Sequence, residues 1–268
     1  MNFCKFFFKT SKELSTFAII FALTALFSAT FFSCSSYDST FDFSSLSAEC
    51  GTSVSLYNDD PYIIAEPTSE VVDSPKAGFI FYPGGLVSYQ AYLPLMIKCA
   101  KSGICCFIIK MPSDFAILNM NAAYRVQKRY PQITNWYIGG HSLGGAMSAS
   151  YVASHTQDFA GLILLAAYST SDISDSSLKV LSVYGTNDGV LNMENYTKYK
   201  TNLPNATSTN PNSNGGYLTE IVIEGGNHAQ YASYGAQSGD GEATITEEEQ
   251  QTITANAIVN LISFFVEK

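Results

Sequence analysis

The sequence predicts an α/β fold, a mostly parallel central sheet with helices on both faces. Short apolar runs such as 77–82 and 104–109 have the length of strands that are buried on both sides. Segments with helix signals separate these runs, and regular alternation of strands with helices is typical of parallel sheets. No internal repeat and no change of composition divides the chain, so a single domain is expected over residues 60–268.

The expected elements alternate along most of the chain. The expected strands cover residues 54–56, 62–64, 77–82, 104–109, 136–139, 160–167, 179–184 and 218–223. The expected helices cover 93–101, 118–130, a small-residue stretch that ends near 155, and 193–200. Residues 203–216 are rich in Asn, Ser, Pro and Gly, and residues 230–242 in Gly, Ser and Gln. The first segment is expected to be a surface loop, and the second either a solvated loop or a flap.

The last helix has the clearest local signals. Thr246 and Glu249 have the spacing of a capping box, which marks a helix start. An apolar stripe at helical spacing follows, made of Ile253, Ala257, Ile258, Leu261, Phe264 and Phe265. This helix is therefore expected to pack on the sheet.

Composition limits the class of partner. The chain has 268 residues, of which 46% are hydrophobic and 14% charged, and its net charge is −9. Nucleic acid is excluded as an expected partner, because binding to phosphates requires clustered Lys and Arg. The six cysteines do not indicate a metal site, since no CxxC pair is present. Cys99, Cys105 and Cys106 fall in a helix end and a buried strand, where cysteine fills space as a small apolar residue.

The N-terminus has the features of an export signal. Three lysines precede the apolar run 17–32, which is short for a membrane span, and Ser33-Cys34 follows. This junction resembles a bacterial lipobox, although Phe31 stands where leucine is usual. The resemblance implies that residues 1–33 are removed and that Cys34 is lipidated. Residues 34–59 are expected to form a tether, which is rich in Ser, Asp and Phe, and an early strand. The expected location is the periplasmic or cell-surface side of a bacterial membrane. Ordinary cleavage and an uncleaved anchor are the alternatives.

A serine lies in a glycine-rich turn after the expected strand 136–139. The pattern Gly140-x-Ser142-x-Gly144 is typical of a sharp turn between a buried strand and a helix. Flanking glycines let the two elements approach closely, and the serine hydroxyl stands clear of the sheet. We therefore expect Ser142 to be a nucleophile, with a plain glycine-rich turn as the alternative.

A serine nucleophile needs a base to remove its proton. Of the three histidines, His141 lies inside the turn and His155 at the end of the next helix, whereas His228 directly follows the expected strand 218–223. His228 is therefore the expected base.

The base in turn needs an acid that holds it in the correct tautomer. Asp188 follows the expected strand 179–184 in the segment Gly-Thr-Asn-Asp-Gly, so its carboxylate is expected at the same edge of the sheet as His228. Asp188 is the expected acid, although Asn-Asp-Gly is also a common turn sequence. Three further candidates for the acid are Asp172, Asp175 and Glu224.

The order Ser142, Asp188, His228, each near a strand end, resembles the α/β-hydrolase family over roughly residues 60–268. The stretches 82–87 (YPGGLV) and 223–230 (IEGGNHAQ) are similar to its dienelactone-hydrolase-like branch. The namesake enzymes differ in two respects, because their nucleophile is a cysteine and they hold an anionic substrate with arginines. The two arginines here, Arg125 and Arg129, lie on a helix outside the turn.

The resemblance implies an oxyanion hole made of backbone amides. One donor is expected at Leu143, directly after the nucleophile, and the other at Gly85, or otherwise at Leu86. Pro83 has no N–H and cannot donate.

The expected function is that of a serine hydrolase that cleaves a carboxylic ester and needs neither a metal nor a cofactor. Its expected partners are a small-molecule ester and, through the lipid anchor, a membrane. The alternative is a surface lipoprotein that keeps the hydrolase fold but binds a ligand without turnover. Tyr89, Tyr231 and Tyr234 flank the expected site and are expected either to line its pocket or to pack in the core.

Overall fold

The computed structural model describes residues 36–41, 43–205 and 210–263 of the chain. The export signal and Cys34 lie outside the described residues. Within the described ranges, no helix combines the length and the apolar character needed to cross a bilayer.

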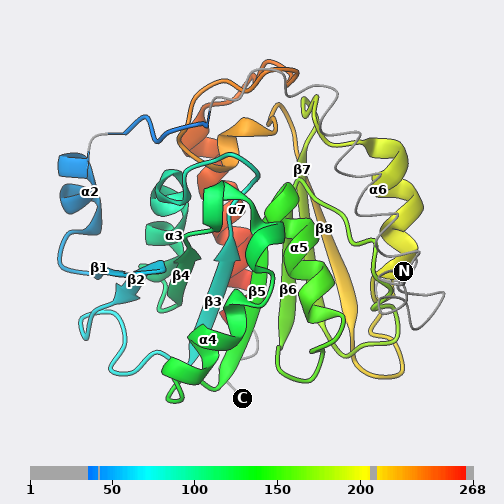
Figure 1. Ribbon diagram of the computed structural model, residues 1–268, viewed down its shortest axis with the longest axis horizontal. Helices are drawn as coiled ribbons and strands as arrows, with labels where there is room; N and C mark the ends of the chain where they lie inside the picture. Colours follow the sequence, from blue (N-terminus) through cyan, green and yellow to red (C-terminus); the bar gives the residue numbers. More distant parts are fainter. Residues whose placement is uncertain (1–35, 42, 206–209, 264–268) are drawn as a thin grey trace, which may run out of the picture. The chain divides into compact units, whose positions relative to one another are not determined.

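An eight-stranded sheet forms the centre of the fold, in the order β1-β2-β4-β3-β5-β6-β7-β8 (Figure 1). The strands are β1 (Val54–Asp59), β2 (Tyr62–Pro67), β3 (Ala77–Tyr82), β4 (Cys105–Ile109), β5 (Asn135–His141), β6 (Gly161–Leu165), β7 (Lys179–Gly185) and β8 (Tyr217–Ile223). β2 pairs antiparallel with both β1 and β4, whereas every pairing from β4 to β8 is parallel. The predicted mostly parallel sheet is therefore confirmed.

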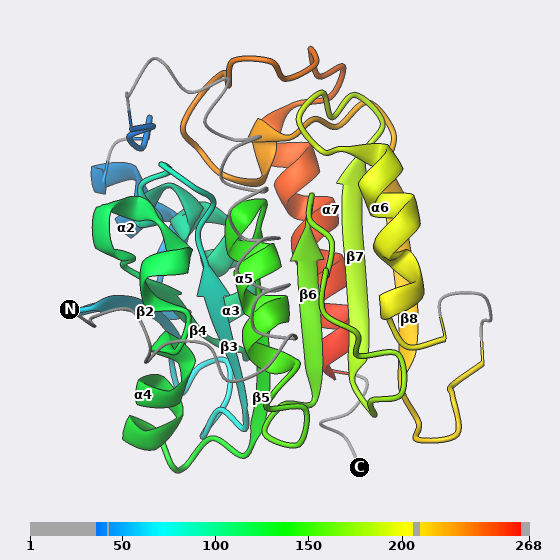
Figure 2. The same cartoon turned by 45° about the vertical axis from the view of Figure 1, so that its right-hand side comes forward.

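Helices cover both faces of this sheet (Figure 2). One face carries α2 (Phe43–Cys50), α3 (Leu93–Ala100) and α7 (Glu247–Ser263), and the other carries α4 (Ala122–Arg129), α5 (Leu143–Val152) and α6 (Met193–Tyr199). Successive strand residues point to opposite faces, so Phe79 and Phe81 pack with the first set and Ile80 and Tyr82 with the second. Burial on both faces explains the uninterrupted apolar runs, of which β4 is the clearest because all its residues are buried.

The expected helix 118–130 begins later than its sequence suggests. A 3-10 turn over Ala116–Asn119 comes first, and α4 begins at Ala122. The hydroxyl of Tyr82 binds at this helix start, where it donates to the Met120 carbonyl at 2.7 Å and accepts from the Ala123 amide at 3.0 Å. This tertiary contact takes backbone groups at the helix start, and short-range propensity cannot reveal it.

The segment expected to be a tether contacts the folded domain. The Tyr37 amide donates to the Leu86 carbonyl at 2.7 Å, and the Ser88 amide donates to the Tyr37 carbonyl at 2.9 Å. The helix α2 then follows, with Leu46 and Cys50 in the core. The described part of this segment is therefore not an extended tether, because its backbone pairs beside the loop that follows β3.

Two local predictions concern caps and cysteines. The capping box is confirmed, since the Thr246 amide donates to Glu249 Oε2 at 2.8 Å and the Glu249 amide donates to Thr246 Oγ1 at 3.2 Å. Phe264 and Phe265 of the predicted stripe lie outside the described residues. The described cysteines are buried and unbridged, namely Cys50, Cys99, Cys105 and Cys106.

Candidate active site

Ser142 lies between the end of β5 and the start of α5. Its backbone has φ 52° and ψ −122°, a conformation that costs a residue with a Cβ about 1–3 kcal/mol. The turn persists because its neighbours hold it: the Ser142 amide donates to the Leu165 carbonyl of β6 at 2.9 Å, and the Ser142 carbonyl accepts from Ala146 at 3.1 Å. The side chain is half-buried at the carboxyl edge of the sheet.

Two glycines of the motif are required by close backbone contacts. A Cβ on Gly140 would lie 2.4 Å from the Tyr82 carbonyl oxygen, and one on Gly144 would lie 2.0 Å from the same atom. β3, β5 and the first turn of α5 therefore meet at a separation that only glycine permits. This contact sets the serine next to the loop that leaves β3.

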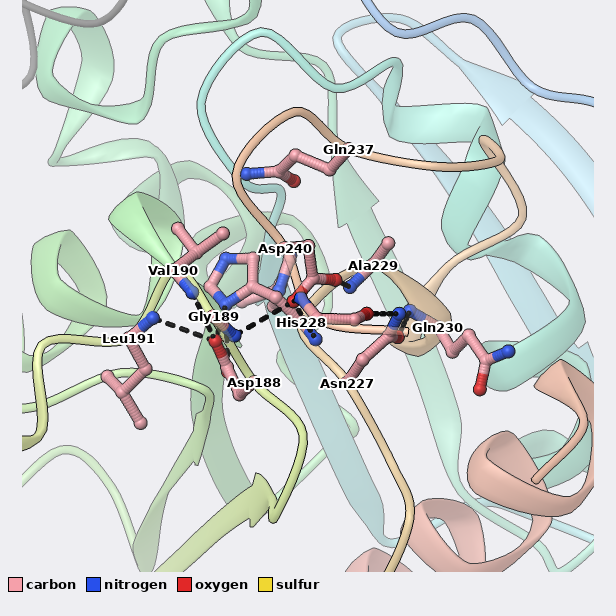
Figure 3. A network of polar contacts seen from close by, with 12 residues as sticks. Asp188, Gly189, Val190, Leu191, Asn227, His228, Ala229, Gln230, Gln237 and Asp240 are labelled. Carbon is pink, nitrogen blue, oxygen red and sulfur yellow. Dashed lines mark hydrogen bonds and ion pairs between the residues drawn. The ribbon is translucent and has the colours of Figure 1, made fainter. Parts of the chain in front are cut away.

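The loops after β7 and β8 bring together Asp188 and His228. His228 Nδ1 lies 2.9 Å from Asp188 Oδ2 and 3.1 Å from Oδ1, and the two side chains are 2% and 1% exposed (Figure 3). Asp188 Oδ1 also accepts the amides of Val190 at 2.9 Å and Leu191 at 2.7 Å. These bonds orient the carboxylate and compensate for its burial.

The second ring nitrogen of His228 is buried and has no hydrogen-bond partner among the described residues. Its ring lies 4.5 Å, between centroids, from that of His141, the residue directly before Ser142. The serine turn and His228, the expected base, are thus neighbours. No hydrogen bond joins the Ser142 hydroxyl to His228 within the described part of the chain, and such contacts are often long without substrate.

The loop after β3 contains both residues that are expected as the second oxyanion donor, Gly85 and Leu86. The Leu86 amide donates to the Asp114 carbonyl at 3.0 Å, so it is already used. Among the described residues, neither the Gly85 amide nor the Leu143 amide makes a hydrogen bond. A Cβ placed on Gly85 would lie 3.1 Å from Leu143 Cδ2, so these two residues pack together. Gly85 and Leu143 therefore lie in contact, and each has an amide that no described residue occupies.

His141 has a different environment from His228. It is buried, and its Nδ1 lies 2.8 Å from the hydroxyl of Tyr92, which also accepts the Gly84 amide at 2.9 Å. Burial, assisted by the neighbouring His228 ring, holds the pKa of His141 well below its usual value, so this ring is neutral. His141 is not placed to serve as the base, but it connects the serine turn to the oxyanion loop.

The remaining candidates lie elsewhere. His155 stacks on Tyr151 and its Nδ1 bonds the Tyr151 carbonyl at 2.8 Å. Asp172 and Asp175 line a polar cavity of about 590 Å³ together with Ser176, in the segment that leads into β7. That cavity is at the amino end of the sheet, opposite to the loops that carry Asp188 and His228.

Sequence reasoning missed several residues that hold the base loop. Gln250 of α7, fully buried, accepts the Asn227 amide at 2.9 Å and donates to the Asn227 carbonyl at 2.8 Å. Asp240 accepts the Gly189 amide from the loop after β7 and the amides of His228 and Ala229 from the loop after β8. Tyr231 and Tyr234 are core residues, which favours their packing role over a pocket-lining one. No sequence signal marks Gln250, because it stands in the polar run 246–252 at the start of α7.

The fold and these loop positions match a known family. A sequence model of the alpha/beta hydrolase family matches residues 78–252, and the chain belongs to this family. A comparison with curated proteins gave no match. The structure is similar to a predicted CIB-like hydrolase from Thermoplasma acidophilum, at 16% identity and a TM-score of 0.54, covering 77% of this chain and 99% of that one. TT1662 from Thermus thermophilus is similar at 12% identity and a TM-score of 0.54, covering 78% and 98%.

At these identities the two solved structures show a shared fold alone. The dienelactone-hydrolase-like branch stays a prediction. Within the described residues, no group of three or more His, Cys, Asp or Glu side chains could hold a metal ion.

Proposed function

We propose that this protein is a serine hydrolase that cleaves a carboxylic ester with Ser142, His228 and Asp188. The observation that carries the proposal is the buried His228–Asp188 pair, at 2.9 Å, next to a serine in a strained turn. Family membership supports the coarser assignment to the hydrolases. The unused amides of Gly85 and Leu143 support the choice of acyl transfer, because a tetrahedral intermediate needs donors for its oxyanion.

The proposed reaction has two steps. The Ser142 hydroxyl oxygen attacks the ester carbonyl carbon while its proton moves to His228 Nε2, and the oxyanion is held by the amides of Gly85 and Leu143. The carbon–oxygen bond to the alcohol breaks, and the alcohol leaves with that proton. A water molecule then gives a proton to His228 and attacks the acyl-enzyme, which releases the acid and restores the serine. Asp188 orients the imidazole and stabilises its charged form throughout.

A fluorophosphonate probe tests the nucleophile, because it forms a covalent bond with an activated serine. We expect the purified full-length protein to be labelled and Ser142→Ala not to be labelled, with Ser150→Ala of α5 as the matched control. Turnover of a chromogenic ester by the wild type, lost in His228→Ala, completes the test. A folded wild type that is neither labelled nor active would favour the non-catalytic binding protein instead.

We also propose that Cys34 carries a lipid anchor that holds the domain on the outer side of a bacterial membrane. The sequence of the first 34 residues supports this proposal. Cys34→Ser is expected to move the protein from the membrane fraction to the soluble fraction. Continued membrane association of the variant would indicate an uncleaved apolar anchor.

A further inference from the structure

A second carboxylate lies between the loops that carry the acid and the base. Asp240 Oδ1 accepts the amides of Gly189 at 3.0 Å and His228 at 3.1 Å, and its Oδ2 accepts the amide of Ala229 at 2.8 Å. Oδ1 also accepts the Gly241 amide at 2.8 Å. Figure 3 shows the Asp240 side chain beside His228, with Asp188 on the other side of the imidazole.

These bonds join two segments that are distant along the chain. Gly189 directly follows the acid, whereas His228 is the base itself and Ala229 follows it. The loops of the acid and the base are also connected by their own contact, by the parallel pairing of β7 with β8, and by two backbone bonds nearer the strands. These are the Thr186 amide to the Ile223 carbonyl at 3.0 Å and the Asn187 amide to the Gly226 carbonyl at 2.8 Å. Hydrogen bonds from amides to an ionised carboxylate are roughly twice as strong as neutral ones. Asp240 therefore joins the two loops at their functional ends, because its partners are the residue after the acid and the amides of the base and its successor.

Neighbouring backbone contacts make this arrangement rigid. The Asn187 side chain donates to the Glu242 carbonyl at 2.7 Å, and the Asn227 side chain donates to the Gly241 carbonyl at 2.9 Å. A Cβ on Gly189 would lie 2.6 Å from the Gly239 carbonyl oxygen, so these two backbones touch. Residues 239–242 of the segment 230–242 thus lie against the loops of Asp188 and His228, although Gly239 and Glu242 are exposed as in a solvated loop.

We propose that Asp240 is a positioning residue that holds the loop of Asp188 and the loop of His228 in the relative position that catalysis requires. The inference rests on the proposed triad, since it gives Asp240 its role through Asp188 and His228. It assigns a chemical role to a residue that makes no contact with the reacting atoms. A positioning role predicts a loss of kcat with little change in KM, because substrate binding does not depend on how Asp188 is placed relative to His228.

Two substitutions give graded expectations. Asp240→Ala removes all the acceptors, and we expect kcat to fall about 100-fold, as for a small misplacement of catalytic groups. Asp240→Asn keeps one acceptor oxygen but places an NH₂ group against the Ala229 amide, so we expect a fall of about 10-fold. KM is expected to change by less than about threefold in both variants.

Amide hydrogen exchange provides a readout that does not require turnover. We expect the Gly189, His228 and Ala229 amides to exchange faster in Asp240→Ala. In Asp240→Asn, Ala229 should lose the most protection. The matched control is Glu242→Gln, which removes one negative charge two residues away from an exposed side chain while leaving its backbone contact with Asn187 in place.

The outcomes separate the two proposals. If the wild type turns over esters but both Asp240 variants match Glu242→Gln in kcat and in amide protection, the positioning role is wrong. If the wild type is inactive and unlabelled by fluorophosphonate, the proposed function fails, while the exchange data still test whether Asp240 joins the loops. If Asp240→Ala does not fold, the kcat and the exchange of Asp240→Asn decide the question.

Discussion

The Tyr92 hydroxyl lies 2.8 Å from Nδ1 of His141. The same hydroxyl accepts the Gly84 amide at 2.9 Å, so its single proton is available for the histidine nitrogen. Burial raises the pKa of Tyr92, which keeps that proton on the hydroxyl. One buried side chain thereby connects the residue before the candidate nucleophile, Ser142, to the residue before the candidate oxyanion donor, Gly85.

Removal of this hydroxyl is expected to weaken the contacts that hold the loop after β3, which contains Gly84 and Gly85. Tyr92→Phe leaves the Gly84 amide and His141 Nδ1 buried without partners, and an unsatisfied buried group costs about 1–3 kcal/mol. We expect a lower free energy of unfolding in urea and a lower kcat, because the Gly85 amide is no longer held against Leu143.

Tyr137→Phe is the matched control for that experiment. The Tyr137 hydroxyl is also buried, but it has no hydrogen-bond partner among the described residues. Its removal is expected to leave stability unchanged or slightly improved. Equal effects of the two substitutions would contradict the role assigned to Tyr92.

The acid can be tested by an isosteric change. Asp188→Asn keeps an oxygen for the amides of Val190 and Leu191 but presents an NH₂ group to His228 Nδ1. The imidazole then adopts the tautomer with its proton on Nε2, which cannot take the serine proton. By analogy with serine protease triads, we expect kcat to fall by about 10⁴-fold with the fold intact.

Asp172→Asn is the comparison variant for the acid. Asp172 is one of the alternative acids, but its carboxylate accepts the Ser174 amide at 3.0 Å and the Ser174 hydroxyl at 2.7 Å within an exposed turn. We expect ester turnover close to that of the wild type. Loss of activity in Asp172→Asn together with retention in Asp188→Asn would reverse the assignment.

The fold was accessible from the sequence because burial on both faces leaves a simple pattern. β4 and β6 are apolar at every position or nearly so, and the glycines of the serine turn are required by contacts under 2.5 Å. The strand-end positions of Asp188 and His228 follow from the parallel topology, since the carboxyl ends of β7 and β8 lie side by side.

The supporting residues were not accessible in the same way. Asp240 and Tyr92 have no motif of their own, and their roles depend on where a loop and a helix are placed by tertiary packing. Asp240 stands in a Gly-Asp-Gly segment that is typical of a solvated turn. Tyr92 resembles any apolar residue at the start of a helix. Only the three-dimensional contacts distinguish these residues from their neighbours.

The depressed pKa of His141 predicts a dependence of stability on pH. In the unfolded chain this histidine takes up a proton near pH 6.5, whereas in the native state it stays neutral to a lower pH. Below about pH 6.5 the unfolded state therefore binds more protons, and the free energy of unfolding falls as pH falls, by up to about 1.4 kcal/mol per pH unit.

His141→Gln removes this titration. We expect the variant to be less stable than the wild type at pH 8, because the contact with Tyr92 is altered, but to lose less stability between pH 7 and pH 5. Urea unfolding of both proteins at several pH values measures the difference in slope. Parallel curves for the two proteins would show that His141 titrates normally in the native state.

Gln250 offers a test of how α7 holds the base loop. Gln250→Leu has a similar volume but leaves both the amide and the carbonyl of Asn227 without their partner, in a site that is fully buried. We expect a loss of about 2–4 kcal/mol in the free energy of unfolding, from two unsatisfied backbone groups. We also expect a lower kcat, since Asn227 directly precedes His228, the proposed base.

Gln127→Leu is the control variant. It removes one bond to the Asp158 carbonyl at the surface, and it is expected to lower the free energy of unfolding by less than about 0.5 kcal/mol. A Gln250 variant as stable and active as Gln127→Leu would mean that β8 alone positions His228.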